Sequence, residues 1–178
     1  AIFHLSVRQR TIETLDRYII MDDVTLEDAS AQLGSLALEG PGAASAVFGV
    51  CRLKLEGLAE HAHTEVSIGG VTCRAVRTTH FGELGAEFLA ERKNLATLWH
   101  ALLDAARQHG GGAIGCAAWN ALRLEAGVPW FGYDFDDKVI PHEAGLETTH
   151  ISFTKGCYTG QEIVERVRSR GQVNRRRM

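Results

Sequence analysis

The chain has 178 residues, of which 45% are hydrophobic and 23% charged, and its formal net charge is −3 at pH 7. These values are ordinary for a globular protein of one or two domains, and they exclude a disordered chain, a collagen and a coiled-coil rod. The net charge also argues against a polycation that binds nucleic acid with its whole surface. No apolar run approaches the roughly 18 residues that cross a bilayer, so we expect no membrane contact.

The N-terminal part of the chain predicts a helix followed by a strand. Ile12, Leu15 and Ile19 recur at spacings of three and four residues, which predicts an amphipathic helix over residues 11–20. In residues 24–28 (VTLED), valine and leucine alternate with polar residues, and this alternation predicts a strand.

The next eighty residues carry the clearest local signals. A strand is predicted over residues 36–38, a short helix over 43–49, and a hairpin with a Gly-Gly turn over 65–79. A further strand is predicted over 85–90, and a continuous apolar stripe predicts a helix over 94–109.

The resulting order of elements between residues 31 and 110 is β-α-β-β-β-α. This order predicts an α+β fold in which antiparallel sheets have helices packed on one face, as in ferredoxin-like or split βαβ subdomains. After it, a helix is predicted over residues 116–126, an irregular aromatic stretch over 130–141, and a final helix that starts at Thr159 or Gly160 and runs to residue 170.

The four cysteines form no CxxC pair, so neither a zinc ribbon nor a thioredoxin-like redox pair is predicted. The N-terminus shows no secretion signal, and we expect reduced thiols in a cytoplasm. We expect three of the cysteines to act as small buried hydrophobes: Cys51, Cys73 and Cys116.

The fourth cysteine, Cys157, stands in the unusual segment KGCYTGQE, between two glycines and just before a predicted helix. Backbone N–H groups and the positive end of a helix dipole stabilise a thiolate in such a place. The alternative is a glycine-rich turn whose cysteine packs inward. The other candidate residues of this thiol segment are Lys155, Gly156, Tyr158, Gly160, Gln161 and Glu162.

Two further groups of possible metal ligands are better explained as ordinary surface residues. His61 and His63 lack a third ligand at a characteristic spacing, so solvated histidines are favoured over a metal site, and no metal is predicted. The acidic stretch that contains Asp134, Asp136 and Asp137 lacks the glycine and the final glutamate of an EF-hand.

The C-terminal end is basic, with six arginines and no acid between Arg166 and Arg177. We expect a basic strand that leads into a further domain. Contact with the phosphates of tRNA through this Arg-rich tail is the alternative.

The segment KGCYTGQE resembles the signature of the YgfZ-type folate-binding proteins, which are relatives of the glycine-cleavage T-protein. Other stretches agree in order and spacing: residues 15–24 (LDRYIIMDDV) are similar to the family's LDRYIxxDDV, and residues 81–88 (FGELGAEF) resemble its TGExGxE. Residues 123–146, which begin RLEAGVP and end EAGL, complete the likeness, which covers roughly residues 11–175.

This resemblance implies a T-protein-like folate-binding fold without its C-terminal β-barrel, and a chain that lacks N- and C-terminal parts. It implies three segments: residues 1–30 as the remainder of the N-terminal folate-binding subdomain, 31–112 as a ferredoxin-like α+β subdomain, and 113–178 as the helix, loop, thiol segment and tail that complete a central cleft. The expected ligand is tetrahydrofolate or another reduced folate.

The resemblance also implies site residues. Glu87 falls where the T-protein keeps its pterin-binding glutamate, and a carboxylate accepts two hydrogen bonds from a pterin's adjacent N–H groups. Arg123 belongs to the shared RLEAG stretch, while Trp119 stands where the T-protein has an arginine. A tryptophan cannot fork two hydrogen bonds, although it can stack on a pterin. Cys157 is the expected functional, catalytic thiol.

The implied role is tetrahydrofolate binding that supports iron–sulfur cluster assembly or repair, including that of radical enzymes that modify tRNA, with iron–sulfur client proteins as partners. One thiol cannot hold a cluster that typically takes four, so Cys157 would act transiently or with a partner. The alternative function is a folate-dependent aminomethyltransferase of the glycine cleavage system; the T-protein lacks the cysteine, which argues against it. An RNA-binding module that uses the arginine tail is the third class.

Overall fold

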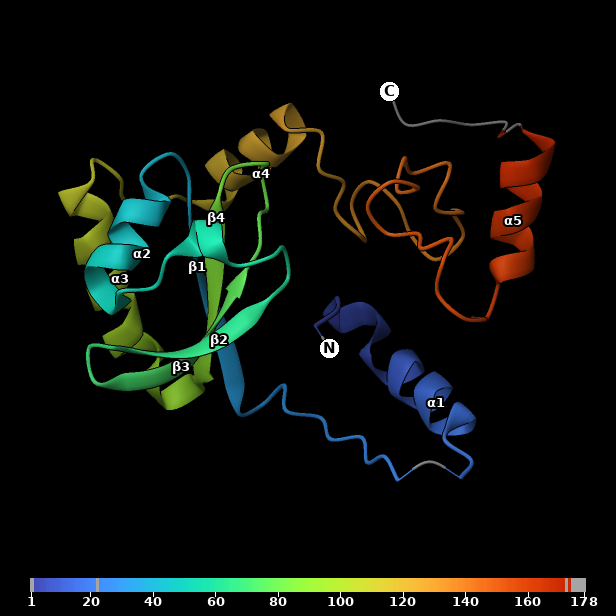
Figure 1. Cartoon of the computed structure of the whole chain (residues 1–178), viewed down its shortest axis with the longest axis horizontal. Helices are drawn as coiled ribbons and strands as arrows, with labels where there is room; N and C mark the ends of the chain where they lie inside the picture. The colour runs from blue at the N-terminus through green and yellow to red at the C-terminus, as the bar shows by residue number, and fades with distance from the viewer. Residues whose placement is uncertain (1, 22, 172, 174–178) are drawn as a thin grey trace. The chain divides into compact units, whose positions relative to one another are not determined.

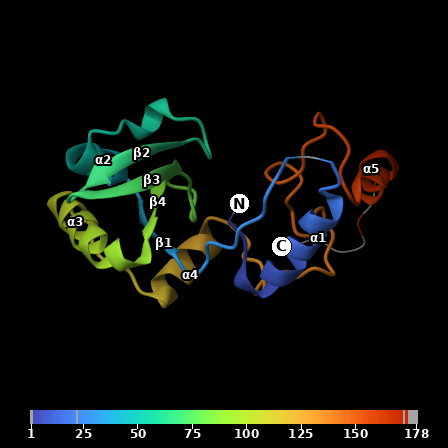
Figure 2. The same ribbon diagram turned by 90° about the horizontal axis from the view of Figure 1, so that it is seen from below.

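The structure is a computed structural model that describes residues 2–21, 23–171 and 173. Its contacts divide the chain into two compact units, one formed by Met21–Val128 and the other by Ala1–Ile20 with Pro129–Met178. Figures 1 and 2 show the elements of each unit.

The unit Met21–Val128 contains a four-stranded sheet and three α-helices. In chain order these are β1 (Leu33–Glu39), α2 (Ala43–Cys51), β2 (His63–Ile68), β3 (Val71–Arg77), β4 (Gly85–Glu91), α3 (Leu95–Gln108) and α4 (Cys116–Glu125), with short 3₁₀ turns at Leu55–Gly57 and Arg92–Asn94. This order confirms the predicted β-α-β-β-β-α pattern and the α+β class.

The sheet has the strand order β1-β4-β3-β2, and each neighbouring pair is antiparallel. Strands β2, β3 and β4 follow one another in the sheet as a meander. Strand β4 therefore runs in the same direction as β2, and β1, which is antiparallel to β4, runs opposite to both. The strands on either side of α2 are therefore antiparallel edge strands. A split βαβ joins strands that run in the same direction, so the predicted ferredoxin-like connection is wrong in this detail.

Helices α2 and α3 lie side by side on one face of the sheet (Figures 1 and 2). Phe88 on β4 is fully buried on that face, together with Val47 of α2 and Leu98 of α3. Because successive residues of a strand point to opposite faces, the neighbours of Phe88 point away from these helices. This alternation defines a second surface, the open face of the sheet.

The second unit contains α1 (Arg8–Tyr18), which follows a 3₁₀ turn at Leu5–Val7, and α5 (Gln161–Arg170). Between Pro129 and α5 the chain is a series of turns with one isolated bridge, from Phe131 to Phe135. Its buried side chains include Ala144, Leu146 and Val164. The final helix has Gly160 as its N-cap at φ 89°, as the sequence predicts.

Three expectations need correction. The strand predicted over residues 24–28 is irregular chain, and the side chains of Val24 and Leu26 are 54% and 37% exposed because no partner strand covers them. The first helix begins at Arg8, three residues earlier than predicted. Cys116 is exposed at the start of α4, whereas Cys73 is buried and Cys51 is half-buried.

The unit boundaries at Ile20 and Val128 differ from the predicted segment boundaries at residues 30 and 112. Helix α4 belongs with the sheet because Trp119 contacts His80 in the loop between β3 and β4. The roles assigned to the three segments remain predictions. Over the ranges that the structure describes, none of the helices has the length and apolar character that crossing a membrane requires.

Candidate functional site

Glu87 lies on the open face of the sheet, near the middle of β4. Its cross-strand neighbours are Val76 on β3 and Ala37 on β1. The side chain of Ala37 is small and exposed, so on the β1 side no bulky group stands over the Glu87 carboxylate. Glu87 itself is half-buried, as expected for a carboxylate seated within a surface rather than extended from it.

Glu39, the last residue of β1, anchors the loop that runs from β3 to β4. Its side chain is only 2% exposed. The carboxylate accepts hydrogen bonds from the hydroxyl of Thr79 at 2.5 Å and from the backbone N–H of His80 and Phe81, both at 2.9 Å to Oε1. Burial alone would raise the pKa of Glu39, but the hydrogen bonds from His80, Thr79 and Phe81 outweigh it and lower the pKa.

His80 is fixed by the same carboxylate. Its Nδ1 lies 3.2 Å from Oε2 of Glu39, and its ring centroid lies 6.3 Å from that of Trp119 on α4. The hydrogen bond to Glu39 raises the pKa of His80; burial opposes this, and the charges of Glu39 and Glu87 add to the increase. The two carboxylates therefore stabilise the protonated form of the imidazole relative to a free histidine.

Arg123 is 2% exposed and makes hydrogen bonds within α4 and just beyond its C-terminal end. Its Nε donates to Oδ1 of Asn120 at 2.9 Å, and its Nη1 donates to the carbonyl of Val128 at 3.2 Å, beyond the end of the helix. The guanidinium carbon also lies 5.9 Å from the ring centroid of Trp119. These contacts make Arg123 a support for Trp119; its predicted contact with folate stays a prediction.

The three residues predicted to bind folate, Glu87, Trp119 and Arg123, all belong to the unit Met21–Val128. His80 relates two of these residues to each other: its ring contacts that of Trp119, and the charge of Glu87 helps to raise its pKa. Sequence reasoning missed His80 and its anchor Glu39. The one available signal was the place of His80 directly before the stretch that resembles the family, since the contact to Glu39 spans 41 residues.

The thiol segment belongs to the second unit. Cys157 is exposed, three residues before the N-cap Gly160 of α5. The backbone N–H of Tyr158 donates to Oε1 of Gln161 at 3.1 Å, and the ammonium of Lys155 lies 4.8 Å from the ring centroid of Tyr158. The side chain of Lys155 is thus placed over an aromatic ring.

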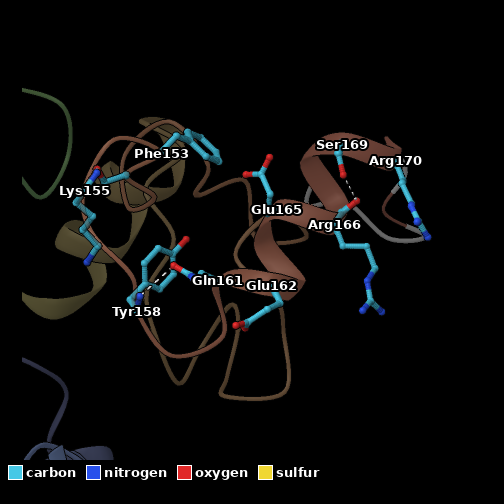
Figure 3. A pocket seen from close by; sticks show the side chains of 10 residues that line it. Phe153, Lys155, Tyr158, Gln161, Glu162, Glu165, Arg166, Ser169 and Arg170 are labelled. Atoms are coloured by element: carbon cyan, nitrogen blue, oxygen red, sulfur yellow. Dashed lines mark hydrogen bonds between the residues drawn. The ribbon is translucent and has the colours of Figure 1, made fainter.

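A pocket of about 460 Å³ lies along α5 and the segment before it. Figure 3 shows the side chains that line it. Both basic and acidic side chains line it, and Cys157 does not. The lining residues are Ser152, Phe153, Lys155, Tyr158, Gln161, Glu162, Glu165, Arg166, Ser169 and Arg170.

Of the basic tail, Arg166, Arg168 and Arg170 lie exposed on α5. Arg168 covers Phe153 at 4.3 Å from the ring centroid. The remaining arginines of the predicted tail, residues 175–177, lie outside the described residues. Within the described ranges, no three His, Cys, Asp or Glu side chains are grouped as a metal site would require.

Comparison with known proteins gives a consistent family. The sequence model of the GCVT N-terminal domain matches residues 2–155. The chain is 34% identical over 148 residues to an aminomethyltransferase from Moorella thermoacetica, covering 83% of this chain and 40% of that protein. It is 30% identical over 154 residues to an aminomethyltransferase from Geobacillus kaustophilus, covering 86% and 42%. The chain thus spans about 40% of the length of these curated relatives.

A solved structure supports the fold. The heterotetrameric sarcosine oxidase from Corynebacterium sp. U-96, in complex with pyrrole 2-carboxylate, matches with a TM-score of 0.50 and 22% sequence identity, covering 60% of this chain and 54% of that one. The family match ends at Lys155, so Cys157 and the rest of the thiol segment stand outside it. With 154 of its residues matched, the chain belongs to the GCVT N-terminal domain family.

Proposed function

We propose that this chain binds tetrahydrofolate and serves one-carbon transfer of the aminomethyltransferase kind. The observation that carries the proposal is the position of Glu87: a half-buried carboxylate on the open face of the sheet, within electrostatic range of His80, which in turn contacts Trp119. The same unit therefore offers an acceptor of two hydrogen bonds, a donor and an aromatic ring, and these groups suit a flat heterocycle with both donor and acceptor atoms.

The ligand test is a calorimetric titration of the full chain with tetrahydrofolate under nitrogen. We expect saturable binding that weakens at least tenfold in Glu87→Gln, because an amide offers only one acceptor oxygen to the two N–H donors. Glu65→Gln is the matched control, since Glu65 is an exposed glutamate of the same sheet on edge strand β2. Equal affinity in all three proteins would contradict the role of Glu87.

Aminomethyl transfer is a proposal for the whole protein, supported by the curated relatives that share the family. The reaction moves a one-carbon unit from an aminomethylated lipoyl carrier protein to tetrahydrofolate. Formation of methylene-tetrahydrofolate by the whole protein, with release of the dihydrolipoyl carrier and of the amino group as ammonia, would support it. A whole protein that binds tetrahydrofolate and releases no product would contradict transfer while leaving folate binding in place.

The second candidate function is thiol chemistry that supports iron–sulfur proteins. It is favoured by the resemblance of KGCYTGQE to the YgfZ-type signature and by the exposure of Cys157 outside the family match. We expect Cys157→Ser to abolish support for an iron–sulfur radical enzyme in cells while tetrahydrofolate affinity changes less than twofold. Cys116→Ser is the control because Cys116 is also exposed. Equal support from both variants would contradict this function.

A further inference from the structure

His80 is an ionisable side chain of the sheet unit that the sequence did not predict as a site residue. His80 has one ring nitrogen committed, because Nδ1 lies 3.2 Å from Oε2 of Glu39. Its backbone N–H donates to both oxygens of the same carboxylate, at 2.9 and 2.8 Å. The residue is therefore held through both its ring and its backbone, and Nε2 makes no hydrogen bond within the described part of the chain.

The groups around His80 favour a donor at Nε2. Glu39 on β1 contacts the ring, the charge of Glu87 on β4 acts on it, and α4 contributes the ring of Trp119 and the buried guanidinium of Arg123, whose carbon lies 5.9 Å from the centroid of that ring. The guanidinium donates to Asn120 and to the Val128 carbonyl. Two carboxylates thus act on the imidazole, and both of its nitrogens carry a proton when it is charged.

A pterin offers three polar atoms in a row along one edge: an exocyclic amino group, a ring N–H and a carbonyl oxygen at position 4. A carboxylate satisfies the first two, because it accepts two hydrogen bonds. The carbonyl oxygen that follows requires a donor. Glu87 is a half-buried acceptor, and His80, held by Glu39 and in contact with Trp119, offers an N–H donor at Nε2 when it is protonated, so the two residues supply this pattern.

We propose that His80 determines specificity at the folate site by donating the Nε2 proton to the 4-oxo group of the pterin, with Glu39 holding the imidazole in place. This inference rests on the proposed folate binding and adds a residue and a selection rule to it. A 4-amino analogue places a donor against the donor of His80, and its adjacent ring nitrogen, which carries no proton, places an acceptor against Glu87; a site built to hydrogen-bond a group rejects the ligand that lacks it. Deprotonation of His80 removes this donor, because the neutral ring keeps its proton at Nδ1, facing the Glu39 carboxylate, and Nε2 then has none.

The test measures the affinity of the full chain for tetrahydrofolate and for its 4-amino analogue by calorimetry at pH 6.0 and pH 8.5. For the wild-type protein we expect at least a tenfold preference for the 4-oxo ligand at pH 6.0, reduced severalfold at pH 8.5. His80→Gln should lose the share of the preference that His80 supplies, together with its pH dependence, while still binding and keeping the share that Glu87 supplies. His100→Gln is the control, because His100 is an exposed histidine of α3, on the opposite side of the sheet.

The outcomes separate the two proposals. Equal wild-type affinity for the two ligands, or a preference that His80→Gln leaves unchanged, would overturn the role of His80 while tetrahydrofolate binding stands. No binding of either ligand by the wild-type protein would overturn the proposed function and this inference together. The wild-type pH series requires no variant, so the inference remains testable if His80→Gln does not fold.

Discussion

The carboxylate of Glu39 and the imidazole of His80 join the end of β1 to the loop between β3 and β4, with 3.2 Å between Oε2 and Nδ1. The register of the sheet sets this contact, because Glu39 pairs with Gly85 in β4. A carboxylate that is 2% exposed and accepts several hydrogen bonds acts as a structural anchor for the loop.

Replacing Glu39 by glutamine should therefore destabilise the sheet unit. Glutamine keeps one acceptor oxygen but adds an N–H₂ group that faces backbone donors, which leaves polar groups unsatisfied. We expect the free energy of unfolding to fall by about 1–3 kcal/mol, measured by urea denaturation. Glu91→Gln is the control, since Glu91 is an exposed glutamate of β4 paired with Lys93, and its replacement should change stability by less than about 0.5 kcal/mol. Equal effects of the two changes would contradict the anchor.

The Glu39–His80 pair also predicts how stability depends on pH. The pKa of His80 is raised above its ordinary 6.5, so the stability that its proton contributes is present below pH 6.5 and is lost as pH rises through the raised value. The pKa of Glu39 is lowered below 4.5, so its contribution is present above pH 4.5 and is lost as pH falls through the lowered value.

We therefore expect the pair to contribute most between about pH 4.5 and 6.5 and its contribution to decline as the pH rises above 6.5 through the raised pKa of His80. Urea denaturation of the wild-type protein and His80→Gln across this range isolates the effect as the difference between the two curves. A difference that stays constant from pH 5.5 to 8.5 would show that His80 binds its proton equally in the folded and unfolded chain.

Local sequence signals predicted most elements of the sheet unit because their causes are local. The Gly69-Gly70 turn forms between β2 and β3 with both glycines at positive φ, 58° and 79°, as a two-residue hairpin requires. The apolar stripe of α3 buries Leu98 and Leu102 as the helical period predicts.

The sequence could not predict features that depend on distant partners. Residues 24–28 alternate like a strand, but a strand needs a neighbour to satisfy its backbone, and none pairs with them in the described chain. The Glu39–His80 contact follows from strand order and register, which no local window contains. For the same reason Glu87 could be proposed as a site residue from resemblance, whereas His80 required the structure.

Replacing each of two glycines by alanine should change the stability of the protein in opposite directions. A Cβ on Gly85 would lie 2.8 Å from the Cβ of Glu39 and 2.8 Å from the carbonyl oxygen of Leu38, so Gly85→Ala should push Glu39 from its place and destabilise the protein by about 1–3 kcal/mol. A Cβ on Gly49, inside α2, would meet nothing within 4 Å. Gly49→Ala should stabilise the helix by about 0.5–1 kcal/mol. Thermal unfolding with opposite shifts of the midpoint would confirm both, and a stabilising Gly85→Ala would refute the close approach.

The four thiols should separate into two classes by accessibility. Cys73 is 3% exposed and burial raises its pKa to about 11; Cys51 is half-buried, its pKa is also raised by burial, and its thiol donates to the Val47 carbonyl. Cys116 and Cys157 are exposed. Thiolate is the species that alkylates, so Cys73, which is buried, and Cys51, whose pKa is raised, react fast only when the unit Met21–Val128 opens.

We predict that iodoacetamide at pH 7.5 modifies Cys116 and Cys157 within minutes in the folded protein and Cys51 and Cys73 only in urea, as read by peptide mass spectrometry. Cys157→Ser should remove one fast site and leave the rate at Cys116 unchanged, since the two lie in different units. Fast modification of Cys73 in the folded protein would contradict its burial in the core. A slow Cys157 would contradict its exposure and argue for the inward-packed turn that the sequence left open.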